Sequence, residues 1–208
     1  MLKNTLLTYK NLKYKTYEIE YEKIVSGIAV KNGFQFEFRD DNFKHLSGLH
    51  KLGLGNLKSP RDIPNKIVQE KINFEQVKRA PKFENFLRRA TALQLISIAL
   101  STPTSYINIY EYSKPVWSKL EADFLIHFKI AAYDYYLFLK KIRTNGGLGT
   151  GAIRCAPVSF FRNEPDYSQQ RRYEHKQTKV KLTSVSKTES SGLVTKIYPW
   201  YVITLYFH

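Results

Sequence analysis

The 208-residue chain has a single cysteine, Cys155. One thiol excludes an internal disulfide and a zinc site built from several cysteines, and it suits a reducing compartment. No stretch approaches the roughly 18 uninterrupted apolar residues that a membrane-spanning helix needs. The first residues also lack the apolar core and the cleavage site of a signal peptide. We therefore expect a cytoplasmic protein with no membrane partner.

Acidic residues are scarce. The chain has 18 Asp and Glu against 33 Lys and Arg, which gives a net charge of +15. Such a charge attracts polyanions, and nucleic acid is the usual polyanionic partner of a basic protein. Because 43% of the residues are hydrophobic and 14% are aromatic, the chain can also bury a core, which excludes a disordered chain.

The basic residues concentrate in the second half of the chain. No acidic residue occurs from Tyr135 through Asn163, and only Glu174 occurs from Arg171 through Lys187. We expect residues of this half to bind the phosphates of nucleic acid, most simply RNA. The predicted nucleic-acid-binding residues are Lys140, Lys141, Arg143, Arg154, Gln170, Arg171, Arg172, His175 and Lys179.

Hydrophobic periodicity predicts an α+β fold in a single domain, residues 1–208. Alternating apolar residues predict strands near 16–22 and 28–38, and stripes at helical spacing predict helices at 64–77 and 82–100. Further strands are predicted at 105–112, 123–130, 133–142, 152–161 and 198–208, with a hairpin at 173–187. N-terminal strands and helices are thus expected to precede an antiparallel sheet.

Few motifs point to a metal or a nucleotide. In "NFKHLSGLHKLGLG" (residues 42–55), His45 and His50 are five residues apart and do not share a helix face, which argues against zinc. The glycine-rich "NGGLGTG" lacks the GK[ST] ending of a phosphate-binding loop. The segment "PDYSQQRRYEHK" contains Asp166, Glu174 and Lys176 in the loose outline of a metal-dependent PD-(D/E)xK nuclease, and this alternative stays open.

RNA cleavage without a metal needs a base for the ribose 2′-hydroxyl, an acid for the leaving oxygen, and cations for the phosphate. Histidine titrates near neutrality and can perform either proton transfer. His45 lies beyond the second predicted strand, in an expected loop, and is a candidate for this role. The alternative is a histidine that only closes a turn.

"FEFRDDNFKHLSGLHKL" (residues 36–52) resembles the "F–x–F…NF–x–HL–x–GL" signature of phage-type nucleases in the barnase–EndoU–colicin–RelE (BECR) superfamily. The similarity is closest to group four. "DFLIHFK", "YDYYLFLKK" and "APVSFFRNEPDYSQQ" resemble the later strands of that group, so the likeness covers about residues 1–198. It implies two helices before a four-stranded antiparallel sheet, and a metal-independent ribonuclease encoded by phages or other mobile elements.

The resemblance also implies site residues. His45 matches the family histidine, Ser47 stands where threonine is usual, and the later motif is matched by Ser159, Arg162, Tyr167 and Gln170. We assign proton transfer to His45, phosphate stabilisation to Arg162 and Lys176, and substrate orientation to Tyr167 and Ser159.

The sequence thus predicts a metal-independent RNA endonuclease of the toxin or effector type, with no cofactor. Its expected partners are RNA, or tRNA in particular, and an immunity or regulatory protein. A non-catalytic phage protein that binds nucleic acid or blocks a host nuclease remains an alternative, because a basic sheet alone fits both functions.

Overall fold

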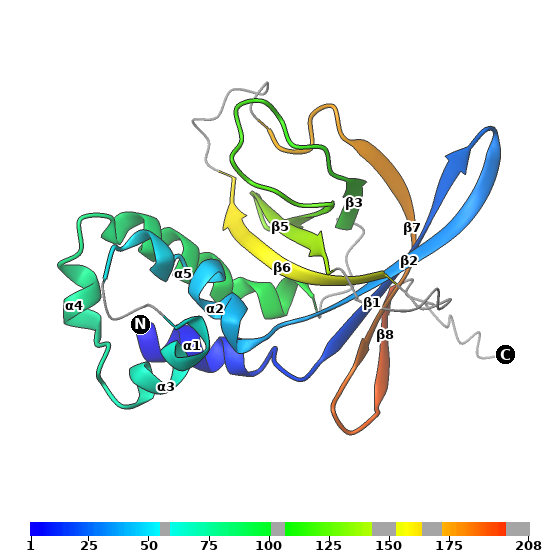
Figure 1. The fold of residues 1–208 in the computed structure, drawn as a ribbon. Helices are drawn as coiled ribbons and strands as arrows, with labels where there is room; N and C mark the ends of the chain where they lie inside the picture. The colour runs from blue at the N-terminus through cyan, green and yellow to red at the C-terminus, as the bar shows by residue number, and fades with distance from the viewer. Residues whose placement is uncertain (55–58, 101–106, 143–152, 164–171, 199–208) are drawn as a thin grey trace, which may run out of the picture.

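A computed structural model describes residues 1–54, 59–100, 107–142, 153–163 and 172–198. Figure 1 shows the helices gathered on one side of a strongly curved sheet. The helical elements are α1 (Leu2–Lys10), α2 (Asp40–Leu46), η1 (Leu49–Lys51), η3 (Pro60–Asp62), α3 (Ile63–Val68), α4 (Phe74–Lys78) and α5 (Phe83–Ala99). The strands are β1 (Thr16–Val25), β2 (Ile28–Glu37), β3 (Ile107–Glu111), β4 (Phe124–Ile130), β5 (Tyr133–Lys141), β6 (Ile153–Arg162), β7 (Thr178–Thr188) and β8 (Val194–Tyr198).

The strands form one sheet in the order β1-β2-β6-β5-β4-β3-β7-β8. β1 pairs with both β2 and β7, so the first seven strands in this order close into a barrel. β8 continues the sheet beyond β7.

The predicted α+β class is confirmed, but a purely antiparallel sheet is wrong. β2 and β6 run parallel, with Phe34 opposite Ile153 and Phe36 opposite Cys155. The N-terminal strands therefore belong to the same sheet as the later ones, and the implied four strands are too few. The hairpin predicted at residues 173–187 is also wrong, because β7 crosses most of that range as one strand and turns back into β8.

The predicted helices are partly confirmed. α5 fits the helix predicted at residues 82–100 to within one residue at each end. The helix predicted at 64–77 is instead two short helices, α3 and α4. Glu70 lies between them with a φ of 57°, a left-handed conformation that a continuous helix does not allow.

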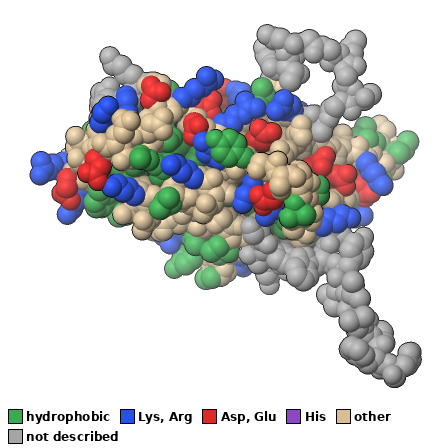
Figure 2. Space-filling view, turned by 90° about the horizontal axis from the view of Figure 1, so that it is seen from below, with side chains coloured by type: hydrophobic (Ala, Val, Ile, Leu, Met, Phe, Trp, Pro, Cys, Tyr) green, Lys and Arg blue, Asp and Glu red, His purple; other side chains and the backbone are tan. Residues whose placement is uncertain are grey.

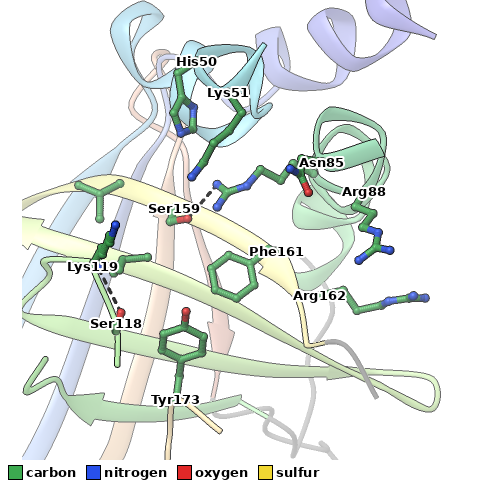
Figure 3. Close-up of a pocket in the computed structure, with 13 residues that line it drawn as sticks. His50, Lys51, Asn85, Arg88, Ser118, Lys119, Ser159, Phe161, Arg162 and Tyr173 are labelled. Atoms are coloured by element: carbon green, nitrogen blue, oxygen red, sulfur yellow. Dashed lines mark hydrogen bonds between the residues drawn. The ribbon is translucent and has the colours of Figure 1, made fainter. Parts of the chain in front are cut away.

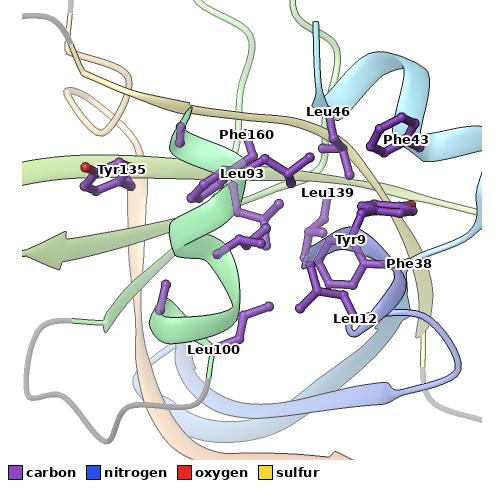
Figure 4. Packing of buried hydrophobic residues seen from close by; sticks show 14 of the residues in the cluster. Tyr9, Leu12, Phe38, Phe43, Leu46, Leu93, Leu100, Tyr135, Leu139 and Phe160 are labelled. Carbon is purple, nitrogen blue, oxygen red and sulfur yellow. The ribbon is translucent and has the colours of Figure 1, made fainter. Parts of the chain in front are cut away.

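The main core lies between α5 and the inner face of the barrel. Figure 4 shows Leu93 and Phe160 packed against each other, with Leu139 beside them. Burial of these side chains is the main source of stability. Cys155 is buried in the same core, and burial raises the pKa of its thiol to about 12, so Cys155 is a packing residue.

Positive charge is spread over the surface. On the face in Figure 2, Lys and Arg side chains extend along the length of the molecule, with Asp and Glu between them. The basic surface is therefore not confined to the sheet, and a concave region is needed to concentrate charge around a ligand.

Among the described residues, no helix is both long and apolar enough to cross a membrane.

Candidate functional site

A cleft of about 430 Å³ lies between the helices and the outer face of β6. Its walls come from η1, α5, the segment before β4, and Tyr173 (Figure 3). The lining residues are His50, Lys51, Asn85, Arg88, Arg89, Ser118, Lys119, Leu120, Val158, Ser159, Phe161, Arg162 and Tyr173. Five of these are Lys or Arg, and none of these described residues is Asp or Glu. The net charge of this lining is therefore positive, which favours binding of an anion.

His50 points into this cleft from η1 (Figure 3). Its Nδ1 lies 3.3 Å from the carbonyl oxygen of Lys44. A carbonyl oxygen can only accept, so this hydrogen bond places the proton on Nδ1 and leaves the Nε2 lone pair available. Burial lowers the pKa of His50 to about 4, against the opposing effect of the carbonyl, and the nearby charges of His45 and Arg89 add to the lowering. His50 is thus neutral at pH 7 and able to accept a proton.

His45 lies beside His50 but does not line the cleft. The two ring centroids are 4.7 Å apart. The expected loop around His45 is wrong, because His45 occupies the last turn of α2. Burial lowers the pKa of His45, and the charges of Lys44 and Arg89 lower it further.

Arg89 is the central cation of the cleft. Its Nη1 donates to Ser159 Oγ at 3.0 Å and to the carbonyl oxygen of His45 at 3.4 Å. Its guanidinium carbon lies 5.4 Å from the ring centroid of Phe161. Burial lowers the pKa of Arg89, although arginine remains protonated. Across the part of the chain that the structure describes, no carboxylate pairs with Arg89, so its charge remains for a bound anion.

The "HLSGL" motif supports Arg89. Ser47 Oγ donates to the carbonyl oxygen of Phe43 at 2.6 Å and ends α2. Gly48 then adopts a φ of 83°, which glycine permits without a steric penalty. A Cβ at Gly48 would lie 2.8 Å from Cδ of Arg89. The glycine therefore provides both the turn into η1 and the space that Arg89 crosses.

We expect Gly48→Ala to displace Arg89 and so to lower any turnover that depends on the cleft. The left-handed conformation should also cost about 1–2 kcal/mol of stability. Gly53→Ala is the matched control, because Gly53 has a φ of 69° and a Cβ there would meet nothing within 4 Å. Thermal unfolding and turnover of both variants test this. Equal activity of the two variants would show that Gly48 serves only the turn.

The floor of the cleft is aromatic. Phe161 and Tyr173 have ring centroids 5.4 Å apart, and Tyr173 also packs against Phe138. The segment that carries Tyr173 is fixed by Arg172, which forms ion pairs with Asp134 and Glu174. The ion pairs of Arg172 therefore help to position the neighbouring Tyr173.

The structure brings two of the predicted catalytic residues into the cleft. Ser159 is buried on β6 and accepts the hydrogen bond from Arg89, and Arg162 lines the far end of the cleft. Lys176 lies elsewhere, in a second hollow that it shares with Arg172, Glu174 and His175. Tyr167, with Arg143, Gln170, Arg171 and Asp166, lies outside the described residues.

The other predicted binding residues lie away from the cleft. Lys140 pairs with Glu121 at 2.9 Å, and Arg154 lies 3.8 Å from Glu37. Lys141 Nζ lies 5.2 Å from the ring centroid of Phe124, and Lys179 is exposed on β7. The role of each in binding nucleic acid stays a prediction.

The helical half contributes basic residues that were not among the predicted site residues, above all Arg89. A signal was present in the spacing of α5. Arg89 lies three, seven and ten residues before Ala92, Ile96 and Ala99, all of which are buried. A charged residue that continues a buried stripe needs a polar environment, and here the cleft provides it.

No group of three or more His, Cys, Asp or Glu side chains that is able to hold a metal occurs among the described residues. Asp134 and Glu174 are partly buried carboxylates of the kind that can bind a metal ion. Both form ion pairs with Arg172 instead. Two of the three residues for the PD-(D/E)xK outline, Glu174 and Lys176, lie together at the second hollow.

Comparison with known proteins gives one match. The family model described as phage-Barnase-EndoU-ColicinE5/D-RelE like nuclease 4 matches residues 1–196. No curated protein and no solved structure matches the chain.

Proposed function

The chain belongs to the family of phage-Barnase-EndoU-ColicinE5/D-RelE like nucleases 4, and we propose that it is an RNA endonuclease whose active site is the cleft around His50 and Arg89. The observation that carries this proposal is the pairing of a neutral, oriented histidine with a partly buried cation in one hollow. These are the groups that metal-free attack by a ribose 2′-hydroxyl requires.

In the proposed reaction, the scissile phosphate binds the Arg89 guanidinium, with Arg162 and Lys119 adding charge at the sides of the cleft. His50 Nε2 accepts the proton of the 2′-hydroxyl. The 2′-oxygen forms a bond to phosphorus as the bond to the 5′-oxygen breaks, which gives a 2′,3′-cyclic phosphate and a 5′-hydroxyl.

The leaving 5′-oxygen needs a proton from the opposite side of the phosphorus, because attack and departure are in line. Figure 3 shows His50 and Tyr173 on opposite sides of the cleft. We assign this proton donation to the Tyr173 hydroxyl.

His45 is given a supporting role in this scheme. It lies outside the cleft lining, and its charge when protonated helps to lower the pKa of His50. Direct proton transfer by His45, the function assigned from sequence, is the competing assignment. RNA is the proposed substrate and partner, with an immunity or regulatory protein as a further proposed partner of a phage-encoded toxin or effector.

The test is cleavage of one RNA and of the DNA with the same sequence, each in excess EDTA and in excess Mg²⁺. We expect the RNA to be cut equally in both buffers and the DNA in neither, because only RNA carries the 2′-hydroxyl nucleophile. Cleavage that requires Mg²⁺ would favour the metal-dependent alternative. Tight binding without turnover would favour a non-catalytic binding module.

A further inference from the structure

Trp117 stands at the edge of the cleft with 42% of its surface exposed. Its ring centroid lies 4.7 Å from that of Tyr173, with the two rings inclined at 62°. The three residues that follow Trp117, namely Ser118, Lys119 and Leu120, all line the cleft. The aromatic floor of the cleft therefore continues outward to an accessible indole ring.

The loop that carries Trp117 is fixed by hydrogen bonds. Ser118 N–H donates to the carbonyl oxygen of Pro115 at 3.0 Å, and Ser118 Oγ accepts from Leu120 N–H at 3.0 Å. The Gln177 side chain holds the start of the loop, since its Oε1 accepts from Ser113 N–H and its Nε2 donates to the Ser113 carbonyl oxygen. Gln177 is four residues after Tyr173, and Ser113 is four residues before Trp117, so these bonds connect the two segments that carry the aromatic residues.

An exposed ring beside a cationic cleft suits one kind of occupant. A nucleobase has an apolar face that stacks on an aromatic side chain, and its phosphate is an anion. A phosphate bound to Arg89 would bring the attached nucleotide close to Phe161. The Phe161 ring packs against Tyr173, and Tyr173 packs against Trp117, so these rings form a continuous aromatic surface.

We propose that Trp117 and Tyr173 form a subsite for one unpaired base next to the scissile phosphate, so that the substrate is a single-stranded stretch of nucleic acid. The inference rests on the proposed function, because it places the phosphate on Arg89. A base within a duplex has both faces covered by its neighbours and cannot stack on Trp117 unless it leaves the helix.

The experiment uses the fluorescence of Trp117 in the full chain. The chain has two tryptophans, and Trp200→Phe leaves Trp117 as the single reporter. The probes are a single-stranded 12-mer of 2′-O-methyl RNA, which lacks the nucleophile, the duplex of that 12-mer, and an abasic strand of the same length. We expect the single strand to quench the fluorescence, and the duplex and the abasic strand to leave it nearly unchanged.

The matched variants are Trp117→Leu and Tyr14→Leu. Tyr14 is 73% exposed and lies outside the cleft lining, so its replacement removes an exposed ring without touching the subsite. Trp117→Leu should weaken binding of the single strand about tenfold, while Tyr14→Leu should not change it. Thermal unfolding of both variants confirms that they are folded.

Equal quenching by the duplex or the abasic strand would overturn the inference, and so would wild-type affinity in Trp117→Leu. The proposed function fails separately. Quenching by the single strand alone, in a protein that cuts no RNA, supports the base subsite and overturns only the catalytic role of the cleft.

Discussion

Replacing His50 with glutamine is expected to lower the rate of RNA cleavage by about 10²- to 10⁴-fold, the usual contribution of general acid–base catalysis. Glutamine keeps a hydrogen-bonding group near the carbonyl oxygen of Lys44 but does not titrate near neutrality. His45→Gln is the matched control, since His45 lies beside His50 and outside the cleft lining. A larger loss in His45→Gln than in His50→Gln would move the base to His45.

The pH dependence of kcat/KM identifies the base. A histidine base must be neutral, so the rate should rise with pH through the pKa of His50 and become level above it. Because burial lowers that pKa to about 4, the rise should lie well below the value of 6.5 for a free histidine. His50→Gln should lose this acidic limb while its affinity for RNA stays close to that of wild type.

Arg89→Met is expected to reduce cleavage about 10²- to 10³-fold, because it removes the partly buried donor proposed to bind the phosphate as its charge develops. Methionine retains much of the length of the side chain and its contact with Phe161. The loss should appear mainly in kcat if the guanidinium stabilises the transition state more than the bound substrate.

The control for Arg89→Met is Arg79→Met, which removes one positive charge from an exposed position outside the cleft. The two variants have the same net charge, so a general loss of electrostatic attraction would affect both alike. Wild-type turnover in a folded Arg89→Met protein would remove the cleft from the proposed mechanism.

Alternation and helical spacing predicted most of the elements. The Phe34 and Phe36 pattern gave β2, and the apolar stripe of α5 gave a helix almost to the residue. Periodicity reports which face of an element is buried, but it does not report the neighbouring strand. The parallel pairing of β2 with β6 joins residues more than a hundred positions apart, and no local pattern encodes it.

Local sequence signals are sufficient to predict that His45 lies in a helix. Asp40 and Asp41 lie in the first turn of α2, where acidic residues favour the helix dipole. The side chain of Asn42 accepts the Arg39 N–H at 3.0 Å and satisfies the start of the helix. These are signals of a helix start, so a helix that includes His45 could be predicted in place of the expected loop.

The cleft itself could not be predicted from the sequence, because its lining residues come from segments far apart in the chain. It combines η1, α5 and β6 with the loop that carries Trp117, and these segments meet only when the barrel closes. Ser159 and Arg162 were found because they fall in a recognisable motif. Arg89 was not found, because its role depends on the two acceptors and the aromatic ring that the fold places around it.

End-group analysis of cleaved RNA in excess EDTA tests the central claim most directly. Wild type should leave a 2′,3′-cyclic phosphate on one fragment and a 5′-hydroxyl on the other, and a single 2′-O-methyl group at the scissile nucleotide should abolish that cut. His50→Gln should yield the same ends at a rate lower by about 10²- to 10⁴-fold. Fragments with 5′-phosphates, or cutting beside the 2′-O-methyl group, would contradict the account.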